Sequence, residues 1–210
     1  LIYNQPSNHE HPTITVDNIG AGREVAQTLI KLGHERLGMV AGQFLASDRA
    51  DARRDGFIKG AAENGLMEPI IIEVDFVSPT LEKTLSPIYA ERETAPTALF
   101  CSNDLLAISV IGALGRLGLD VPKDVSVIGF DGIAVGTHLH PTLATVIQPS
   151  YEMGRAATQQ LLDRLAGKDC PLTKILPHTL RIGESAGPAI NYSPAYIINS
   201  KQEKQWRSSK

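Results

Sequence analysis

Short apolar segments and helical patterns take turns along most of this chain. Residues 37–42 are continuously apolar, which is typical of a strand that is buried on both faces of a parallel sheet. Elsewhere apolar residues recur at helical spacing, and glycines such as Gly33 and Gly118 mark the expected helix ends. The pattern predicts strands over residues 13–16, 37–42, 70–74, 97–101 and 125–130, and helices over residues 21–32, 51–63, 80–91 and 105–117.

The regular alternation predicts an α/β protein built from parallel sheets with helices on both faces, because consecutive βαβ units wind with one hand. The rhythm changes after the last of these strands, where residues 132–143 are predicted to form a loop. A short strand over residues 144–147, a helix over 151–165 and a strand region over 173–182 that Pro177 interrupts are expected next. An irregular tail should follow.

Composition places the chain among soluble globular proteins, since 42% of its 210 residues are hydrophobic and 20% are charged. No apolar run approaches the ~18 residues of a membrane span, so no membrane contact is expected. The net charge is -3, and basic residues are not gathered into a stripe before the C-terminal end. This distribution disfavours direct DNA contact by this chain alone.

The two cysteines, Cys101 and Cys170, could pair, but Cys101 lies within an apolar run and is most simply a buried small side chain. A reducing cytoplasm is therefore the expected location. The chain begins with Leu1 rather than Met, and we expect it to be a fragment or a processed product.

Polar side chains follow the predicted strands at the points where these end. In open parallel sheets, ligands bind beyond the carboxyl ends of the strands. Any one of these residues could simply serve a turn or a helix N-cap. Taken together they predict a polar cleft for a small molecule rich in hydroxyl or amide groups. The set comprises Asp17, Asn18, residues 43–54, Asp75, Phe76, residues 102–104, Asp131 and Gln148.

A search for catalytic motifs finds little. The chain has no Gly-x-Ser-x-Gly elbow and no phosphate-binding loop, and residues 20–22 lack the third glycine of a dinucleotide fingerprint. Two histidine pairs, at residues 9 and 11 and at residues 138 and 140, have no second cluster that would complete a metal site. We therefore expect no metal, no cofactor and no enzymatic activity, with Asp104 and Asp131 in structural or ligand-binding roles.

Five segments in this order and at this spacing resemble the LacI/GalR (lactose-repressor-type) family of transcriptional regulators, over about residues 13–170. Taken singly the motifs are weak, and the fourth and fifth are the most diagnostic. The segments are Val16-Asp17-Asn18 with Gly33-His34; Gly42 with Arg53 and Gly56-Phe57; Pro96-Thr97-Ala98 with Ser102-Asn103-Asp104; Val121-Pro122 with residues 124–131; and residues 141–146 with Gln148-Pro149.

The resemblance implies a two-lobed sensor similar to periplasmic sugar-binding proteins, with the effector between the lobes. The chain would cross from one lobe to the other near residues 17–18, 147–148 and 169–174. The implied division is residues 1–17 and 148–170 in an incomplete N-terminal lobe, residues 18–147 and 171–190 in the C-terminal lobe, and residues 191–210 in a flexible tail. Operator DNA would be contacted only through an N-terminal head that is absent from this chain, and a homodimer is expected.

The resemblance also implies the ligand-binding residues. Arg53, three positions before the Gly-Phe pair, corresponds to an effector-contacting arginine, and Phe76 to an aromatic residue that packs on the effector ring. Asn103 and Asp131 would supply polar contacts from the strand ends. The crossover would be lined by Asp17 and Gln148. Where many members carry a glycine, this chain has Leu81, so the loop after Phe76 departs from the family pattern.

The favoured interpretation is a cytoplasmic effector-binding domain whose ligand is a sugar, a nucleoside or a related small molecule. Two alternatives stay open. A periplasmic sugar-binding protein of a transport system would share the architecture, although the fourth and fifth motifs are repressor-like. An enzyme of the doubly wound class would use Asp104 or Asp131 and would convert its ligand rather than release it unchanged.

Overall fold

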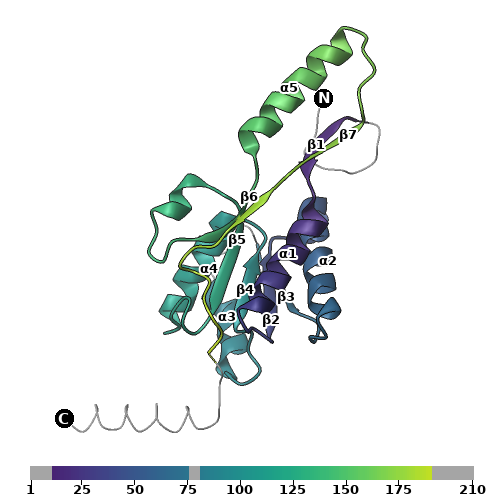
Figure 1. Cartoon of the computed structure of the whole chain (residues 1–210). Coiled ribbons are helices and arrows are strands. Elements are labelled where there is room, and N and C mark those ends of the chain that lie inside the picture. Colours follow the sequence, from purple (N-terminus) through teal and green to yellow (C-terminus); the bar gives the residue numbers. More distant parts are fainter. Residues whose placement is uncertain (1–10, 76–80, 191–210) are drawn as a thin grey trace, which may run out of the picture.

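The computed structural model describes residues 11–75 and 81–190, which form a large sheet flanked by helices and a smaller projecting unit (Figure 1). The tail predicted at residues 191–210 lies outside the described residues. The elements in chain order are β1 (Thr13–Val16), α1 (Asn18–Lys31), β2 (Leu37–Ala41), the 3-10 helix η1 (Phe44–Ala46), α2 (Asp48–Glu63), β3 (Ile70–Glu73), α3 (Leu81–Ala90), β4 (Ala98–Cys101), α4 (Asp104–Arg116), β5 (Ser126–Asp131), the 3-10 helix η2 (Ala134–Thr137), β6 (Ala144–Ile147), α5 (Ser150–Leu165), β7 (Thr173–Leu176) and β8 (Thr179–Arg181).

The large sheet has the strand order β3-β2-β4-β5-β6-β8. Its first five strands are parallel, and β8 joins the edge antiparallel to β6. Every residue of β2 and β4 is buried, which explains why these segments are continuously apolar in the sequence. The predicted α/β fold class with parallel strands and flanking helices is confirmed.

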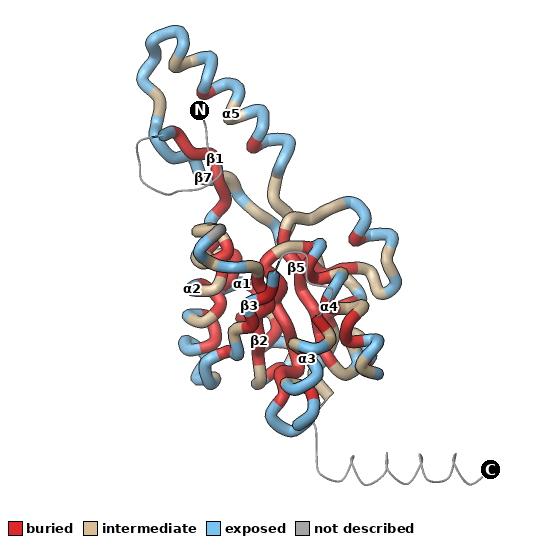
Figure 2. Tube along the Cα trace, turned by 180° about the vertical axis from the view of Figure 1, so that it is seen from behind, coloured by how far each residue is buried: buried red, intermediate tan, exposed pale blue. Residues whose placement is uncertain are grey.

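Two hydrophobic cores lie on opposite faces of this sheet. Phe57 of α2 packs against Phe100 of β4, with ring centroids 5.3 Å apart. Leu99, the neighbouring strand residue, points to the other core, which contains Val110 of α4. Helices α1 and α2 therefore cover one face, and α3 and α4 cover the other. Figure 2 shows the buried strands between exposed outer helix surfaces.

Helices α1 and α2 pack with their backbones in close contact, because glycines stand at the crossing. A Cβ atom on Gly22 would lie 2.1 Å from the carbonyl oxygen of Arg53, and one on Gly56 would lie 2.0 Å from that of Ile19. Neither position has room for a side chain. The close approach sets the Arg53 segment of α2 directly against the first turns of α1.

A smaller unit projects from the carboxyl edge of the large sheet (Figure 1). It consists of β1, paired in parallel with β7, and α5. The sequence interpretation assigned residues from 171 onward to the larger lobe, whereas Thr173–Leu176 pairs with β1 instead. The change of sheet occurs at Pro177 and His178, between β7 and β8. The strand-like pattern of residues 173–182 gave no signal for which sheet each half would join.

The segment after β8 is irregular, as predicted, but its first residues are packed rather than free. Ser185 is fully buried; its hydroxyl donates to the carbonyl oxygen of Val127 over 2.6 Å and accepts from the Ala144 amide over 2.9 Å.

Cys101 is buried as expected, and burial raises the pKa of its thiol. Within the described ranges, none of the helices is both long and apolar enough to cross a bilayer.

Candidate ligand-binding site

Arg53 is the central cation at the carboxyl edge of the sheet. It lies on the inner face of α2 and is only 5% exposed. Its Nε donates to Asn18 Oδ1 over 2.8 Å, and Nη1 donates to the carbonyl oxygen of Ser102 over 2.6 Å. The guanidinium carbon lies 3.4 Å from the centroid of the Phe130 ring, within cation–π distance. Contacts along two edges and one face therefore fix the orientation of this guanidinium.

Asp131 supplies the opposite charge. Burial raises the pKa of its carboxyl, and Arg53 acts in the other direction. Burial likewise lowers the pKa of Arg53 to about 9, while the carboxylates of Asp131 and Asp104 oppose that change. A pKa near that value leaves the guanidinium protonated at neutral pH. The site thus holds a positive and a negative group in a partly dehydrated environment.

Asp131 also has an unusual backbone. Its φ angle is 120°, in a region that side-chain-bearing residues rarely adopt. Two hydrogen bonds from Gln148 stabilise this backbone conformation. The side-chain Nε2 of Gln148 donates to Asp131 Oδ1 over 2.7 Å, and the backbone N–H of Gln148 donates to the Asp131 carbonyl oxygen over 3.3 Å. Strained conformations of this kind persist where the surroundings impose them, and they cluster at functional sites.

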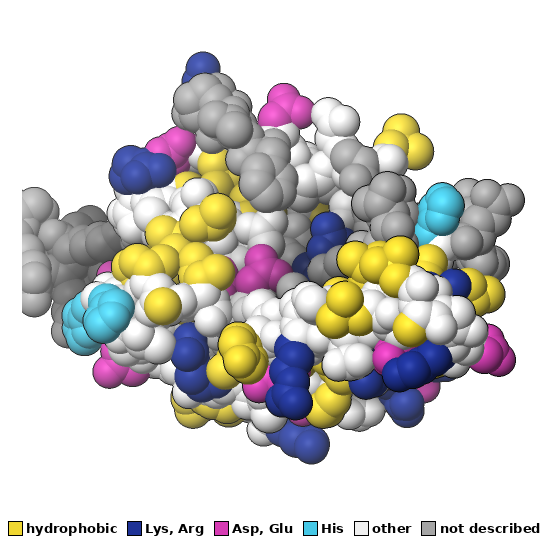
Figure 3. Space-filling model, turned by 90° about the horizontal axis from the view of Figure 1, so that it is seen from above, with side chains coloured by type: hydrophobic (Ala, Val, Ile, Leu, Met, Phe, Trp, Pro, Cys, Tyr) yellow, Lys and Arg dark blue, Asp and Glu magenta, His cyan; other side chains and the backbone are white. Residues whose placement is uncertain are grey.

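These groups border an open pocket of about 450 Å³. Seen from above, acidic and basic side chains meet near the centre of a hollowed face (Figure 3). The pocket lies at the carboxyl ends of β2, β4 and β5, where ligands bind in sheets of this kind. Its lining residues are Gly42, Gln43, Ser47, Arg49, Ala50, Arg53, Asp75, Ser102, Asn103, Leu105 and Asp131.

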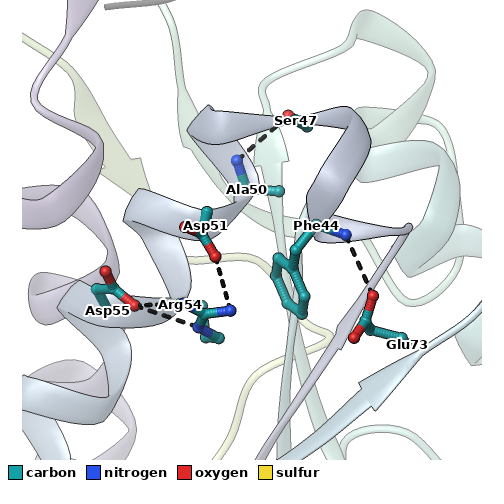
Figure 4. Close-up of polar contacts among 7 residues, drawn as sticks. All are labelled: Phe44, Ser47, Ala50, Asp51, Arg54, Asp55 and Glu73. Atoms are coloured by element: carbon teal, nitrogen blue, oxygen red, sulfur yellow. Dashed lines mark hydrogen bonds and ion pairs between the residues drawn. The ribbon is translucent and has the colours of Figure 1, made fainter. Parts of the chain in front are cut away.

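The loop between β2 and α2 forms one wall and is tied down at several points (Figure 4). The backbone amide of Phe44 donates to Glu73 Oε2 over 3.2 Å. The guanidinium carbon of Arg54 lies 4.7 Å from the Phe44 ring centroid, and two aspartates of α2 pair with Arg54 at 2.6 and 2.8 Å. Ser47 caps α2 by accepting from the Ala50 amide over 3.3 Å. These contacts fix the position of the wall, and Arg49 and Arg53 of the adjoining helix α2 line the pocket beside it.

Comparison with known proteins identifies the family. Residues 26–186 match the model of a periplasmic binding protein-like domain. The chain belongs to this family. It is 33% identical over 183 residues to the HTH-type transcriptional repressor PurR of Serratia proteamaculans, an alignment that covers 84% of this chain and 53% of that protein. The chain thus spans about half the length of the curated relatives it matches.

Solved structures of LacI-type regulators agree with this assignment. A LacI-type transcriptional regulator from Bacillus cereus subsp. cytotoxis superposes with a TM-score of 0.81 at 26% identity, covering 90% of this chain and 68% of that one. A complex of the transcriptional regulator CelR with cellobiose superposes with a TM-score of 0.78 at 27% identity, covering 88% of this chain and 58% of that one. The resemblance to LacI/GalR effector-binding domains is confirmed.

The site of this periplasmic binding protein-like domain contains three of the six residues that the family resemblance assigned to ligand binding. Arg53, Asn103 and Asp131 line the pocket. Asn103 has a structural duty as well, because its Oδ1 accepts from the Leu106 amide over 2.9 Å and caps α4. Gln148 reaches the site through Asp131 and is absent from the pocket lining.

Asp17, which the resemblance assigned to ligand binding, is not among the residues that line the pocket. Asp17 caps α1 instead, with its Oδ1 accepting from the Gly20 amide over 2.8 Å, and its side chain is exposed. An aspartate directly before a helix commonly serves this purpose. Phe76 lies outside the described residues.

The sequence placed Asn18 and Arg49 in the polar set at the strand ends without giving either a role of its own, and it did not single out Leu105 for the site. Arg49 stands four positions before Arg53 and shares its helix face, a spacing that could have indicated its place beside Arg53. Leu105 was included in an apolar helix, yet it is 59% exposed and forms an apolar part of the pocket. The contact between Asn18 and Arg53 spans 35 positions and has no local signal in the sequence.

Among residues 11–75 and 81–190, no cluster of His, Cys, Asp or Glu has the arrangement of a metal site.

Proposed function

We propose that this chain is the effector-binding and dimerisation part of a LacI-type transcriptional regulator, and that its effector is a sugar or a similar uncharged polyol. The observation that carries the proposal is that the buried Arg53 and the half-buried Asp131 place opposite charges beside an open pocket at the carboxyl edge of the sheet. In this role the chain binds its effector without converting it chemically, and it acts in the cytoplasm.

The charges around the pocket favour an uncharged ligand. Arg49 and Arg53 are balanced by Asp75 and Asp131 among the lining residues. A hydroxyl group suits this arrangement, since it can donate to a carboxylate and accept from a guanidinium at once. The CelR–cellobiose complex among the relatives supports a carbohydrate.

Regulation follows from the position of the pocket beside the projecting unit. A ligand that contacts both parts stabilises one relative placement, and it shifts the equilibrium only by its difference in affinity for the two states. Operator DNA would be bound by a head outside this chain, and pairing of two copies would set the spacing of the two heads.

Isothermal titration calorimetry with cellobiose, D-ribose, adenosine and citrate tests the ligand class. We expect a sugar to bind, and Arg53→Lys to weaken its affinity by about 10- to 100-fold, because a lysine cannot reproduce the planar fork of donors. Arg116→Lys is the matched control, since Arg116 lies at the C-terminal end of α4, has a side chain that is 63% exposed and is not part of the pocket lining.

Three results would contradict the proposal: binding of citrate alone, equal losses in both variants, or chemical conversion of the sugar observed by NMR. The first would identify an anion-binding site. The second would show that Arg53 does not contact the ligand specifically, and the third would indicate an enzyme.

Sedimentation equilibrium tests the dimer. The chain is expected to show a reversible association from one to two copies as its concentration rises, because mass action favours the pair at high concentration. A mass that stays at one copy up to the highest concentration would remove dimerisation from the proposal.

A further inference from the structure

Asn18 links the projecting unit to the pocket through one side chain. It is the first residue of α1, directly after the crossover from β1, and is 5% exposed. Its Nδ2 donates to the carbonyl oxygen of Val16 over 3.1 Å and to Thr15 Oγ1 over 3.4 Å. Its Oδ1 accepts from Arg53 Nε over 2.8 Å. The amide nitrogen is thus bound to the crossover strand and the amide oxygen to the pocket cation.

The hydrogen bond from Arg53 to Asn18 determines how the guanidinium faces the pocket. A guanidinium is a planar fork with five N–H donors. Asn18 holds the Nε edge, the Ser102 carbonyl holds Nη1, and Phe130 lies against one face. With these three contacts in place, the plane and rotation of the fork are set, and so are the directions of the other donors. Without the contact to Asn18, the fork could turn about its remaining anchor.

At a second crossover, a side-chain amide binds the oppositely charged group, Asp131, in a similar way. Gln148 follows β6, where the chain passes from the large sheet to α5, and its amide donates to Asp131 Oδ1 over 2.7 Å. Each of the two central charged groups is therefore held by a carboxamide from a different crossover. Such an arrangement makes the geometry of the pocket depend on how the crossover strands are placed.

We infer that Asn18 is a positioning residue of the effector pocket, which couples the placement of the crossover strand β1 to the orientation of the Arg53 guanidinium. The inference rests on the proposed function, because it assigns Asn18 a part in ligand binding at the same pocket. A displacement of β1 relative to α1 moves the acceptors of the Asn18 amide, and Arg53 responds through Oδ1. Ligand that holds Arg53 in the observed orientation then favours the observed placement of β1.

Hydrogen exchange at Arg53 Nε–H, followed by NMR on the 15N-labelled chain, tests the contact without any ligand. The resonance is assigned by its loss in Arg53→Lys. Asn18→Leu keeps a similar size but removes the acceptor, and we expect exchange to accelerate about tenfold or more. Asn64→Leu is the matched control: it makes the same substitution at the C-cap of α2, where the amide donates to the Gly60 carbonyl oxygen over 2.8 Å.

Titration with cellobiose and D-ribose tests the consequence for binding. We expect Asn18→Leu to weaken the affinity for the sugar that binds by about 10- to 100-fold, and Asn64→Leu to change it less than about twofold. Asn18→Asp separates the two ends of the amide. It retains an acceptor for Arg53 but loses the donor to Val16, so the Nε–H should stay protected while the affinity still falls.

The outcomes are distinguishable. Unchanged exchange and unchanged affinity in a cooperatively folding Asn18→Leu variant would overturn the inference. If Asn18→Leu does not fold, Asn18→Asp decides: a protected Nε–H with weakened affinity supports the coupling, and unchanged affinity overturns it. If neither sugar binds the unaltered chain, the proposed ligand class fails, whereas the exchange rates still decide whether Asn18 positions Arg53.

Discussion

Buried charges dominate this molecule at the scale of single residues. Asp104 is fully buried at the start of α4, next to the pocket. Its Oδ1 accepts from Thr145 Oγ1 over 2.5 Å, and its Oδ2 accepts from the Ile133 amide over 2.8 Å. It therefore joins α4 to β6 and to the turn after Asp131. Burial raises the pKa of Asp104, although these hydrogen bonds favour the ionised form.

The raised pKa of Asp104 predicts how stability depends on pH. As the pH rises above the ordinary Asp pKa of about 3.9, the unfolded chain loses this proton before the folded protein does. The contribution of Asp104 to the free energy of unfolding therefore falls with rising pH until the folded pKa is passed. Asp104→Asn cannot titrate, so its stability should decline less with pH than that of the unaltered chain.

Urea unfolding between about pH 4 and pH 8 measures this difference. Asp169→Asn is the control, because it makes the same substitution at an exposed position outside the pocket. A profile for Asp104→Asn parallel to that of the unaltered chain would show that Asp104 has the same pKa in both states.

At the scale of elements, the crossing of α1 and α2 places the pocket arginine. Glycines at both contact points let the helix backbones touch, and carbonyl oxygens occupy the space where side chains would be. The close approach brings Asn18, at the start of α1, within hydrogen-bonding distance of Arg53. Helix packing and site geometry are therefore parts of one arrangement.

Substitution of two helical glycines should have opposite effects on stability. In Gly56→Ala the new Cβ would meet the Ile19 carbonyl oxygen at 2.0 Å, so the helices must separate. We expect a loss of about 1–3 kcal/mol or more in the free energy of unfolding. Gly154→Ala is the matched control on α5: its Cβ meets no atom within 4 Å, and a gain of about 0.5–1 kcal/mol follows from helix propensity.

Chemical denaturation measures both variants, and titration with the bound sugar shows whether Gly56→Ala also weakens the site. Equal stability changes in the two variants would mean that the helix crossing tolerates a side chain, contrary to the packing described above.

At the scale of the whole molecule, stability is distributed unevenly. The large sheet is buried between two helical layers, and β4 is buried along its whole length. Among the described residues, the projecting unit has two strands, and β7 is exposed at most positions. Several apolar side chains of this unit are also exposed: Leu161, Leu162, Leu165, Leu172 and Ile175. Although β1 is buried, a two-stranded sheet whose other strand is largely exposed is marginal by itself.

Amide hydrogen exchange should reveal this difference between the two parts. We expect amides of β4 and β5 to exchange only on global unfolding, and those of β7 to exchange faster by about two orders of magnitude through local opening. Mass spectrometry of peptic peptides provides the measurement. Equal protection of β4 and β7 would show that the two parts unfold as one cooperative unit.

The sequence by itself determined the order and type of most elements, because periodicity and helix-end glycines are local properties. It also indicated the edge of the sheet that carries the pocket, since polar residues follow each buried strand. Arg53 and Asp131 could be named in advance from the family pattern, and both line the pocket. The role of Asp17 could not, because a strand-end aspartate and a helix cap look the same in sequence.

Only the tertiary structure decided which distant residues meet. The contact between Asn18 and Arg53 depends on the distance between two helices, and that distance is set by Gly22 and Gly56 together. The partner of β7 depends on where the chain changes sheets at Pro177. Hydrophobic periodicity reports which face of an element is buried but carries no information about its partner. The polar contacts that shape the pocket therefore follow from packing between elements that lie far apart in the chain.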